Sequence, residues 1–511
     1  MAVKIILLVV FFAVMVGVGL YSRKHTTSVD GFVLGGRTVG PWLTAFAYGT
    51  SYFSAVVFVG YAGQFGWKYG LASTWIGLGN AVIGSLLAWV ILGRRTRVMS
   101  QHLQSKTMPD FFGSRYDSKA LKITASAIAF IFLVPYTASV YNGLSRLFGM
   151  AFNIPYEVCV IVMALFTAAY VILGGYMATA INDFIQGIVM LFGIVAVIAA
   201  VLNGQGGFME AVRKLAQLES DVAVTAGQPG AFTSFFGTDP LNLLGVVILT
   251  SLGTWGLPQM VHKFYAIKDE KAIHTGTIIS TLFAVVISGG CYFLGGFGRL
   301  FDSEAIYNAE TGAVVYDSII PYMLSRLPDI LIGVVIVLVL SASMSTLSSL
   351  VMTSSSTLTL DFLKDNIIKK MDEKKQVITM QIFIVFFIVL SVVIALDPPT
   401  FIAQLMGISW GALAGAFLAP FLYGLYWKGV TKAAVWASFA CGVGITVSNM
   451  FLKYIASPIN AGAIAMIAGL IVVPVVSVIT PKMKKETVDR LFTCYEEEVV
   501  LTKKDSLEAG R

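Results

Sequence analysis

The chain consists of long apolar runs separated by short breaks that hold charged residues, Pro or Gly. Each run is close to the roughly 20 residues that an α-helix needs to cross the hydrocarbon core of a bilayer. The pattern predicts thirteen spans, near 3–21, 42–66, 72–93, 120–150, 155–173, 183–203, 241–262, 274–298, 328–358, 377–396, 400–426, 433–452 and 460–480. The first run lacks a small-residue cleavage site and its basic cluster follows it, so we expect a retained helix and not a signal peptide.

Composition supports a membrane protein and argues against an enzyme. Of the 511 residues, 57% are hydrophobic and 12% are charged, whereas soluble domains carry about 25% charged residues. The four cysteines are scattered and show no metal or disulfide spacing. With four histidines and no nucleophile or nucleotide-binding motif, we expect no catalytic activity.

The basic residues are distributed unevenly between the two sides of the predicted bundle. If the N-terminus is outside, 27 of the 35 Lys and Arg residues fall inside, among them those of segments 94–122, 263–271 and 364–375. The positive-inside rule therefore predicts an outside N-terminus and an inside C-terminus. The net charge of +7 then marks the cytoplasmic face, and nearly all of these residues are topology anchors. A nucleic-acid partner is not needed to explain the charge.

Two spans contain Gly and hydroxyl residues at mid-depth, and the seventh also contains Pro258. The second reads WLTAFAYGTSYFSAVVFVGYAG and the seventh LLGVVILTSLGTWGLPQMVHKF. Helix breaks free backbone groups that must face protein, water or a ligand in a membrane. Each broken span opens a group of five, and an odd number inverts the second group relative to the first. Paired breaks in inverted repeats are typical of secondary transporters, with a solute and ion site between them.

These features predict an all-α polytopic membrane protein with six parts. Residues 1–41 form an extra N-terminal helix and a cytoplasmic loop, 42–203 the first five-helix repeat and 204–240 an external loop. The second repeat covers 241–426, two further helices 427–481, and a charged cytoplasmic tail with a loose helix 482–511.

A hydroxyl-rich segment lies in the inner half of the ninth span. Eleven of the seventeen residues of SASMSTLSSLVMTSSST, 341–357, are Ser or Thr. Ala342, Ser345 and Thr346 share one helical face, which Ser348 and Ser349 continue. Neutral oxygens suit a weakly held hard cation such as Na⁺. Hydroxyls also bond their own helix or a neighbouring one, and we favour that role for 354–357.

Asp183, in ATAINDFIQG, begins the sixth span. A carboxylate at a helix start is often a cap or a partner of the helix dipole. Acidic residues in transporter cores also relay ions. The sequence leaves both roles open.

Four segments, DGFVLGGRTVGPW, LGGYMATAINDFIQG, GLPQMVHKFYAIKD and SASMSTLSS, resemble the sodium/solute symporter family, and the likeness runs over about 28–480. It implies a LeuT-type core of two inverted five-helix repeats, with one extra helix before it and two after. It also implies a Na⁺ site made of the carbonyls of Thr50, Phe53 and Ala342 and the hydroxyls of Ser345 and Thr346. A second Na⁺ site, present in a subset of the family, would use Asp183, Ser345, Ser348 and Ser349. With this second site occupied, we expect two Na⁺ ions to be transported per solute.

The resemblance is less specific about the solute. Proline permeases carry Asp and Trp where this chain has Tyr52 and Val56, and Trp and Tyr where it has Thr250 and Thr254, although Tyr136 matches. The stretches TSYFSAVVFVG and GLPQMVHKFYAIKDEKAIHTG look closer to pantothenate permeases. The implied solute site comprises Tyr52, Ser54, Val56, Tyr136, Ser139, Thr250 and Thr254.

The expected function is Na⁺-coupled uptake of a small carboxylate-bearing solute, pantothenate-like or proline-like, across the cell membrane, with no obligate protein partner. Alternatives are another solute such as a monocarboxylate or a sugar, or a membrane sensor that does not transport. A passive channel fits less well, because channels build pores from symmetric subunits or charged rings.

Overall fold

The computed structural model describes residues 2–22, 28–364, 367–368 and 371–495, and these residues contain helices and no β-strand. The α-helices are α1 (Ala2–Ser22), α2 (Val29–Leu34), α3 (Pro41–Tyr52), α4 (Ala62–Tyr69), α5 (Thr74–Gly79), α6 (Arg94–His102), α7 (Met108–Arg115), α8 (Lys119–Phe152), α9 (Tyr156–Gly204), α10 (Phe208–Ala216), α11 (Pro240–Leu252), α12 (Pro258–Ala266), α13 (Glu270–Gly295), α14 (Tyr316–Ser325), α15 (Asp329–Ser356), α17 (Glu373–Leu396), α18 (Ile402–Tyr426), α19 (Lys432–Leu452), α20 (Pro458–Ile479) and α21 (Lys485–Phe492). Short π-helical stretches at 56–61, 80–87, 89–93 and 357–363 continue neighbouring helices.

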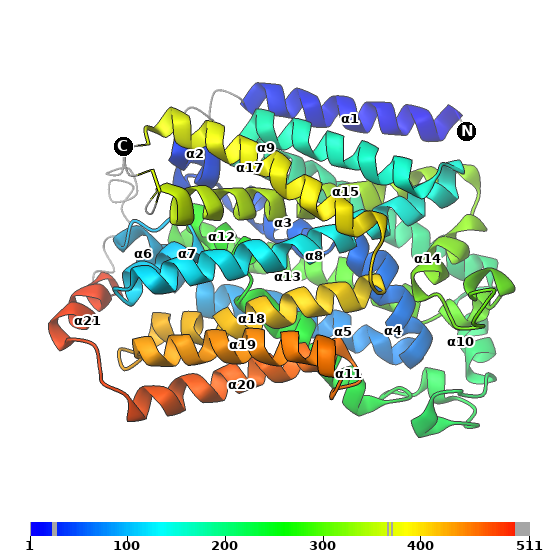
Figure 1. Ribbon diagram of the computed structural model, residues 1–511. Helices are drawn as coiled ribbons and strands as arrows, with labels where there is room; N and C mark the ends of the chain where they lie inside the picture. The colour runs from blue at the N-terminus through cyan, green and yellow to red at the C-terminus, as the bar shows by residue number, and fades with distance from the viewer. Residues whose placement is uncertain (1, 23–27, 365–366, 369–370, 496–511) are drawn as a thin grey trace.

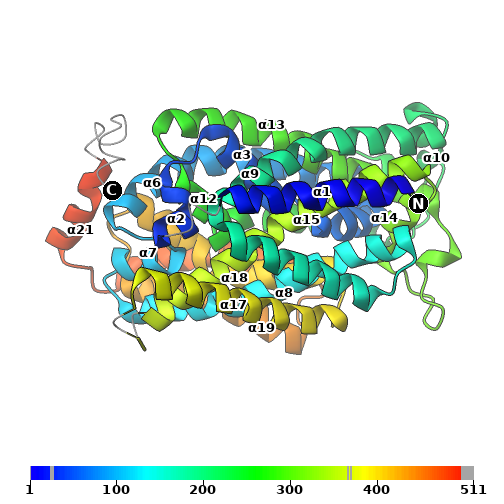
Figure 2. The ribbon, with the colours of Figure 1, turned by 90° about the horizontal axis from the view of Figure 1, so that it is seen from above.

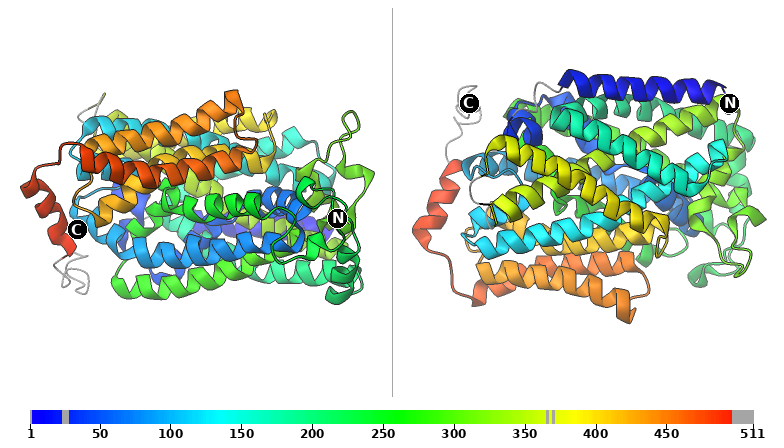
Figure 3. Two further views of the ribbon diagram at one scale, coloured as in Figure 1. Left: turned by 90° about the horizontal axis from the view of Figure 1, so that it is seen from below. Right: turned by 45° about the horizontal axis from the view of Figure 1, so that its top comes forward.

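Most of the long helices run roughly along one common direction, and the two ends of the bundle differ (Figure 1). The N-terminus, α10 and α14 lie at one end, and the C-terminus, α6, α7 and α21 at the other. We call these the N-terminal end and the C-terminal end of the bundle. In Figure 2, seen from above, α1 lies across the outer surface, and it packs on α9 and α15. Figure 3 shows α19 and α20 on the opposite flank, where they pack on α18. The helices α1, α19 and α20 therefore flank a core that is formed by the other long helices.

The helices begin where the sequence supplies caps. Side-chain oxygens of Ser28, Thr107, Ser118, Asp239 and Asp269 each accept a hydrogen bond from a backbone N–H of the first turn. Such caps satisfy donors that a helix leaves unpaired. The external loop predicted over 204–240 contains the short helix α10, and the segment 299–327 between the predicted eighth and ninth spans contains α14. Of the predicted tail, α21 is a short helix, and 496–511 lie outside the described residues.

Ten helical stretches of the described chain are long and apolar enough to cross a membrane, or eleven if the bent pair α11–α12 counts as one span. Two of them, Val56–His102 and Tyr156–Gly204, have 47 and 49 residues. At 1.5 Å per residue each would measure about 70 Å, more than twice the roughly 30 Å of a bilayer core. Each contains a glycine with a positive φ that interrupts the helix, Gly70 (φ 61°, ψ −141°) and Gly175 (φ 57°, ψ −159°). Tyr48 donates to the carbonyl oxygen of Gly84, so the chain after Gly70 returns beside α3.

The predicted breaks in the second and seventh spans are confirmed. Helix α3 ends at Tyr52, Phe53 is extended (φ −110°, ψ 104°), and helical structure resumes near Val56. After α11, a 3₁₀ turn covers Gly253–Trp255, Leu257 is extended, and α12 begins at Pro258 with a 41° change of direction. Pro258 has no N–H to donate and suits a helix start.

Helix α14 is fastened across the N-terminal end of the bundle by a buried carboxylate. Asp317 is 1% exposed, and its Oδ2 accepts the backbone N–H of Ile402, at the start of α18, over 3.2 Å. The Nε of Arg146, on α8, lies 4.0 Å from the same oxygen. Burial raises the pKa of Asp317 from 3.8 to about 6, and Arg146 and the Ile402 N–H oppose that rise. Compared with the unfolded chain, the folded protein thus favours the protonated form of the Asp317 carboxyl.

We predict that Asp317→Asn changes how stability depends on pH. The raised folded-state pKa stabilises the wild type most fully below about pH 4, and that contribution is lost as pH rises through about 6. Relative to the wild type, the variant should therefore gain about 1–3 kcal/mol between pH 4 and pH 7. Thermal unfolding of the detergent-solubilised protein at several pH values measures this. Asp302→Asn, which removes an exposed carboxyl from the same loop, is the control. A trend shared by both variants would contradict the assignment.

Candidate functional site

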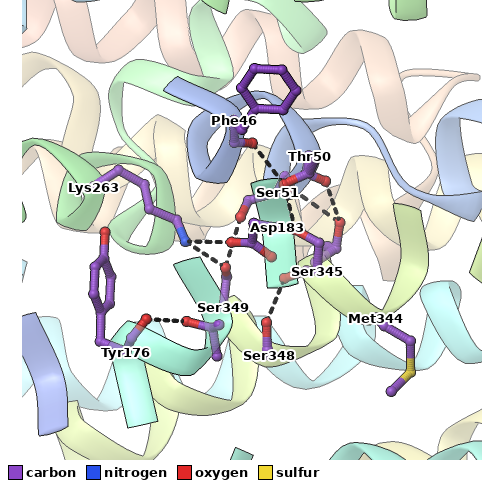
Figure 4. A network of polar contacts seen from close by, with 12 residues as sticks. Phe46, Thr50, Ser51, Tyr176, Asp183, Lys263, Met344, Ser345, Ser348 and Ser349 are labelled. Atoms are coloured by element: carbon purple, nitrogen blue, oxygen red, sulfur yellow. Dashed lines mark hydrogen bonds and ion pairs between the residues drawn. The ribbon is translucent and has the colours of Figure 1, made fainter. Parts of the chain in front are cut away.

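The two helix breaks face the middle of α15, the helix that carries the hydroxyl-rich segment. Helix α15 packs against α3, α9 and α12, which bring the second span, the sixth span and the second half of the seventh to one place. Figure 4 shows side chains from all four helices pointing toward one another. Every Ser and Thr of α15 from Ser341 to Ser356 is buried. The hydroxyls therefore line an interior and not a surface.

The hydroxyl of Thr346 lies where α3 ends. Its Oγ1 is 3.3 Å from the carbonyl oxygen of Thr50, 3.2 Å from that of Ser51 and 3.1 Å from that of Ala342. The Ser345 Oγ donates to the Thr50 Oγ1 over 2.7 Å. The structure thus brings together four of the five residues expected at the first Na⁺ site. These oxygens are neutral and buried, which suits a hard cation that must also be released.

Phe53, the fifth expected residue, lies at the break itself. Its N–H donates to the Gly49 carbonyl over 3.2 Å, and its ring stacks on that of Tyr52 with centroids 4.3 Å apart. Among the described residues, no contact joins the Phe53 carbonyl to the Thr346 hydroxyl. In this conformation the second α3 carbonyl beside Thr346 belongs to Ser51, which sequence reasoning did not single out. Phe53 as a ligand stays a prediction.

The residues expected at a second site lie next to the first, toward the C-terminal end. Asp183, on α9, is 1% exposed. The Ser349 Oγ lies 2.7 Å from the Ser51 Oγ, and the Ser348 Oγ donates to the Ser345 carbonyl over 2.8 Å. The long helix α9 (Tyr156–Gly204) is kinked at Gly175, and Asp183 lies about two turns beyond that kink, inside the second half of the helix. A helix-start cap is therefore not its role.

A buried lysine completes this cluster. The Lys263 Nζ, on α12, lies 3.7 Å from the Asp183 Oδ2 and donates to the Ser349 Oγ over 2.9 Å (Figure 4). Lys263 is 2% exposed, so its reading as a topology anchor was wrong. The sequence carried one signal: Lys263 follows the break at Pro258 within a turn and a half, beside an apolar run. A lysine at the end of a span usually reaches the interface, and that general rule misled the interpretation.

Aromatic rings line the region between the two breaks. The Tyr52 hydroxyl donates to the Thr250 carbonyl over 2.5 Å, which ties the end of α3 to the end of α11. Trp410, on α18, has its ring 6.1 Å from that of Tyr52 and 5.8 Å from that of Tyr136. Tyr52, Tyr136 and Trp410 are nearly fully buried. Sequence reasoning missed Trp410, because no pattern within the predicted span 400–426 relates this residue to Tyr52 of the second span.

The other residues expected to contact solute bond to nearby backbone. The Ser139 Oγ donates to the Tyr136 carbonyl, Thr250 to that of Val246, and Thr254 to those of Gly84 and Ser251. The Ser54 Oγ accepts the Val56 N–H over 3.2 Å, inside the α3 break. Ser54 and Thr254 therefore lie within the two breaks and Thr250 lies at the end of α11, whereas Ser139 lies on α8, one turn from Tyr136.

Apolar helices with two broken spans that face a hydroxyl-rich helix define a secondary membrane transporter. The family model of the Sodium:solute symporter family matches residues 32–442, and the chain belongs to this family. It is 29% identical over 501 residues to the Sodium/proline symporter of Staphylococcus aureus strains JH9 and JH1, covering 94% of this chain and 93% of those proteins.

Solved structures give the fold. A Na⁺-coupled sialic acid symporter, substrate-bound and outward-open, matches with a TM-score of 0.74 and 15% identity, over 94% of this chain and 99% of that one. Mhp1, a nucleobase-cation-symport-1 family transporter in a closed conformation with bromovinylhydantoin, matches with a TM-score of 0.53 and 14% identity, over 91% and 98%. The all-helical LeuT-type architecture is thereby confirmed. Family membership gives Na⁺-coupled solute transport, which is not an enzyme class.

We predict that Tyr52→Phe lowers stability by about 1–3 kcal/mol, because the buried Thr250 carbonyl loses its donor where no water replaces it. Thermal unfolding in detergent measures the loss. Tyr426→Phe is the matched control: its hydroxyl donates to the Ile91 carbonyl from an exposed side chain, so water can take its place. Equal losses in the two variants would contradict a special role for the Tyr52 tether.

Proposed function

We propose that this protein couples inward Na⁺ movement to the uptake of a small carboxylate-bearing solute by alternating access. The observation that carries the proposal is the Thr346 hydroxyl, which faces the carbonyls of Thr50, Ser51 and Ala342 at the break of α3. A Na⁺ ion placed among these oxygens would find neutral ligands from two helices, α3 and α15. Moving one helix relative to the other would then open the site and release the ion. This links ion binding to the conformational change.

We further propose the full topology and location. The chain would cross the cell membrane thirteen times, with its N-terminus outside and its C-terminus inside. Support comes from the charge distribution, from the ends of the chain at opposite ends of the bundle, and from the two overlong helices, each interrupted by a glycine with a positive φ. A second Na⁺ site at Asp183, Ser345, Ser348 and Ser349 belongs to the same proposal.

The solute would bind between the breaks, beside Tyr52, Tyr136 and Trp410. Aromatic faces suit the apolar body of a small organic acid, and backbone N–H groups freed at the breaks suit its carboxylate. The curated relatives are sodium/proline symporters, whereas Tyr52 and Val56 replace residues typical of proline permeases. We favour a pantothenate-like or proline-like solute, with a monocarboxylate or a sugar as the alternative.

An uptake assay in proteoliposomes tests the function. With an inward Na⁺ gradient, labelled solute should accumulate for one member of a panel of proline, pantothenate, short monocarboxylates and sugars, and a K⁺ gradient of equal size should not replace it. Absence of Na⁺-driven accumulation for every member, from protein shown to be folded, would favour a sensor that does not transport.

We predict that Ser345→Ala and Thr346→Ala each raise the Na⁺ concentration for half-maximal uptake about 5-fold to 150-fold. Each removes one buried oxygen from the first site, which costs about 1–3 kcal/mol. Ser355→Ala is the matched control on the same helix, because its Oγ donates to the Met352 carbonyl of its own helix. Na⁺ dependence that is unchanged in both site variants, or shifted equally in the control, would rule out the assignment.

A further inference from the structure

The Lys263 ammonium lies among the residues proposed to hold a second Na⁺. We propose that Lys263 is a tethered cation that exchanges with Na⁺ at this position. Its ammonium pairs with Asp183 when the position holds no Na⁺, and an arriving Na⁺ displaces it. The inference rests on the proposed function, because it assigns a role to a residue within the proposed ion path.

The ammonium joins four helices. Lys263 comes from α12, the second half of a broken span, and its partners Asp183 and Ser349 come from α9 and α15. The Ser349 Oγ in turn shares a hydrogen bond of 2.7 Å with the Ser51 Oγ of α3. Lys263 and Asp183 are both nearly fully buried. The position therefore already holds a cation, and this cation is covalently attached to a helix next to a break.

Na⁺ and the ammonium cannot share this position. One carboxylate neutralises one charge, and two cations a few ångströms apart in a buried site repel strongly. The Ser349 hydroxyl accepts from Lys263 with one of its two lone pairs, so at most one remains for a Na⁺ ion. Binding of Na⁺ therefore requires that Lys263 leaves.

A small cavity beside the cluster offers the ammonium another place. It measures about 10 Å³, enough for about one water-sized sphere, and its lining includes Tyr176, Gln259, His262 and Lys263. Within the described part of the chain, the Gln259 amide oxygen, the His262 Nε2 and the Tyr176 hydroxyl have no hydrogen-bond partner. The Lys263 Nζ already lies 5.3 Å from the centre of the Tyr176 ring, within range of a cation–π contact. A displaced ammonium thus finds acceptors without reaching solvent.

A purely structural brace is the alternative, and it predicts the opposite sign. If the pair only holds α12 against α9, removing the Lys263 charge leaves Asp183 unpaired and loosens the ion path. Na⁺ would then bind with the same or lower affinity. If Lys263 competes with Na⁺, its removal raises Na⁺ affinity.

The test measures Na⁺-dependent thermal stabilisation of the purified full-length protein, at constant ionic strength with K⁺, so that no transport is needed. In Lys263→Gln we expect the half-saturating Na⁺ concentration to fall at least about tenfold relative to the wild type. This gain in Na⁺ affinity should disappear in the double variant Lys263→Gln/Asp183→Asn. An unchanged or higher half-saturating concentration in Lys263→Gln would overturn the proposal.

Two further variants separate the possible failures. Lys122→Gln removes a lysine that contacts Asp110 over 2.7 Å outside the cluster, and it should leave the Na⁺ response as in the wild type. Thr346→Ala should weaken the response. If Na⁺ gives no more stabilisation than K⁺ in the wild type, the proposed function fails. If Thr346→Ala weakens the response but Lys263→Gln does not strengthen it, only the exchange fails.

Hydrogen–deuterium exchange on the wild type tests the proposal even if Lys263→Gln does not fold. Displacement of Lys263 frees α12 (Pro258–Ala266) from α9 and α15, so Na⁺ should raise amide exchange in this segment relative to K⁺. Unchanged or lower exchange in α12, in protein that Na⁺ stabilises, would show that the ammonium stays in place and would overturn the exchange.

Discussion

The structure depends on one constraint: every backbone group freed at a helix break inside a membrane must find a partner. Each unsatisfied group costs several kcal/mol in hydrocarbon. At the α3 break the Thr346 hydroxyl meets the freed carbonyls of Thr50 and Ser51. A hydroxyl donates a hydrogen bond to carbonyls and offers lone pairs to a cation. The same side chain can therefore satisfy the break without Na⁺ and share its ligands with Na⁺, which makes the break stable in both states.

The two broken spans are held in different ways. Beyond the first break, α4 packs so closely on α13 that a Cβ at Gly66 would lie 2.0 Å from the Gly295 carbonyl oxygen. Beyond the second break, α12 is buried along its whole length, and it also carries the polar contacts of Lys263 with Asp183 and Ser349. Close backbone packing has no second arrangement of similar energy, whereas an ion pair does if another cation replaces its partner. The α12 half is thus the one that an ion can release.

Sequence reasoning recovered what is local and periodic. Apolar runs predicted the long helices, and the spacing of Ser345 and Thr346 predicted the face that meets α3. Gly and hydroxyl residues at mid-depth, joined by Pro258 in the seventh span, predicted both breaks. It missed contacts that depend on how distant segments are packed. Trp410 joins Tyr52 only because α18 is buried beside the first break, and no period encodes that pairing. Lys263 was interpreted as an interfacial anchor because it lies near the end of a predicted span. Its burial depends on the direction that α12 takes after Pro258, which the sequence pattern does not show. Ser51 was not among the expected ligands because the backbone conformation at the break decides which α3 carbonyls face Thr346.

The buried pair also bears on the step that returns a carrier without its ions. Asp183 is almost fully buried, and an isolated carboxylate in such a place is costly. A site that used Na⁺ alone would have to bear that cost each time Na⁺ left. With Lys263 at 3.7 Å, the charge on Asp183 stays neutralised whether Na⁺ is bound or not, because one cation leaves as the other arrives. Since Lys263 moves with α12, the exchange couples the charge on Asp183 to the position of a half-helix. In the proposed exchange, ion release and movement of α12 would occur together, and the return step would need no intermediate with an unpaired Asp183 carboxylate.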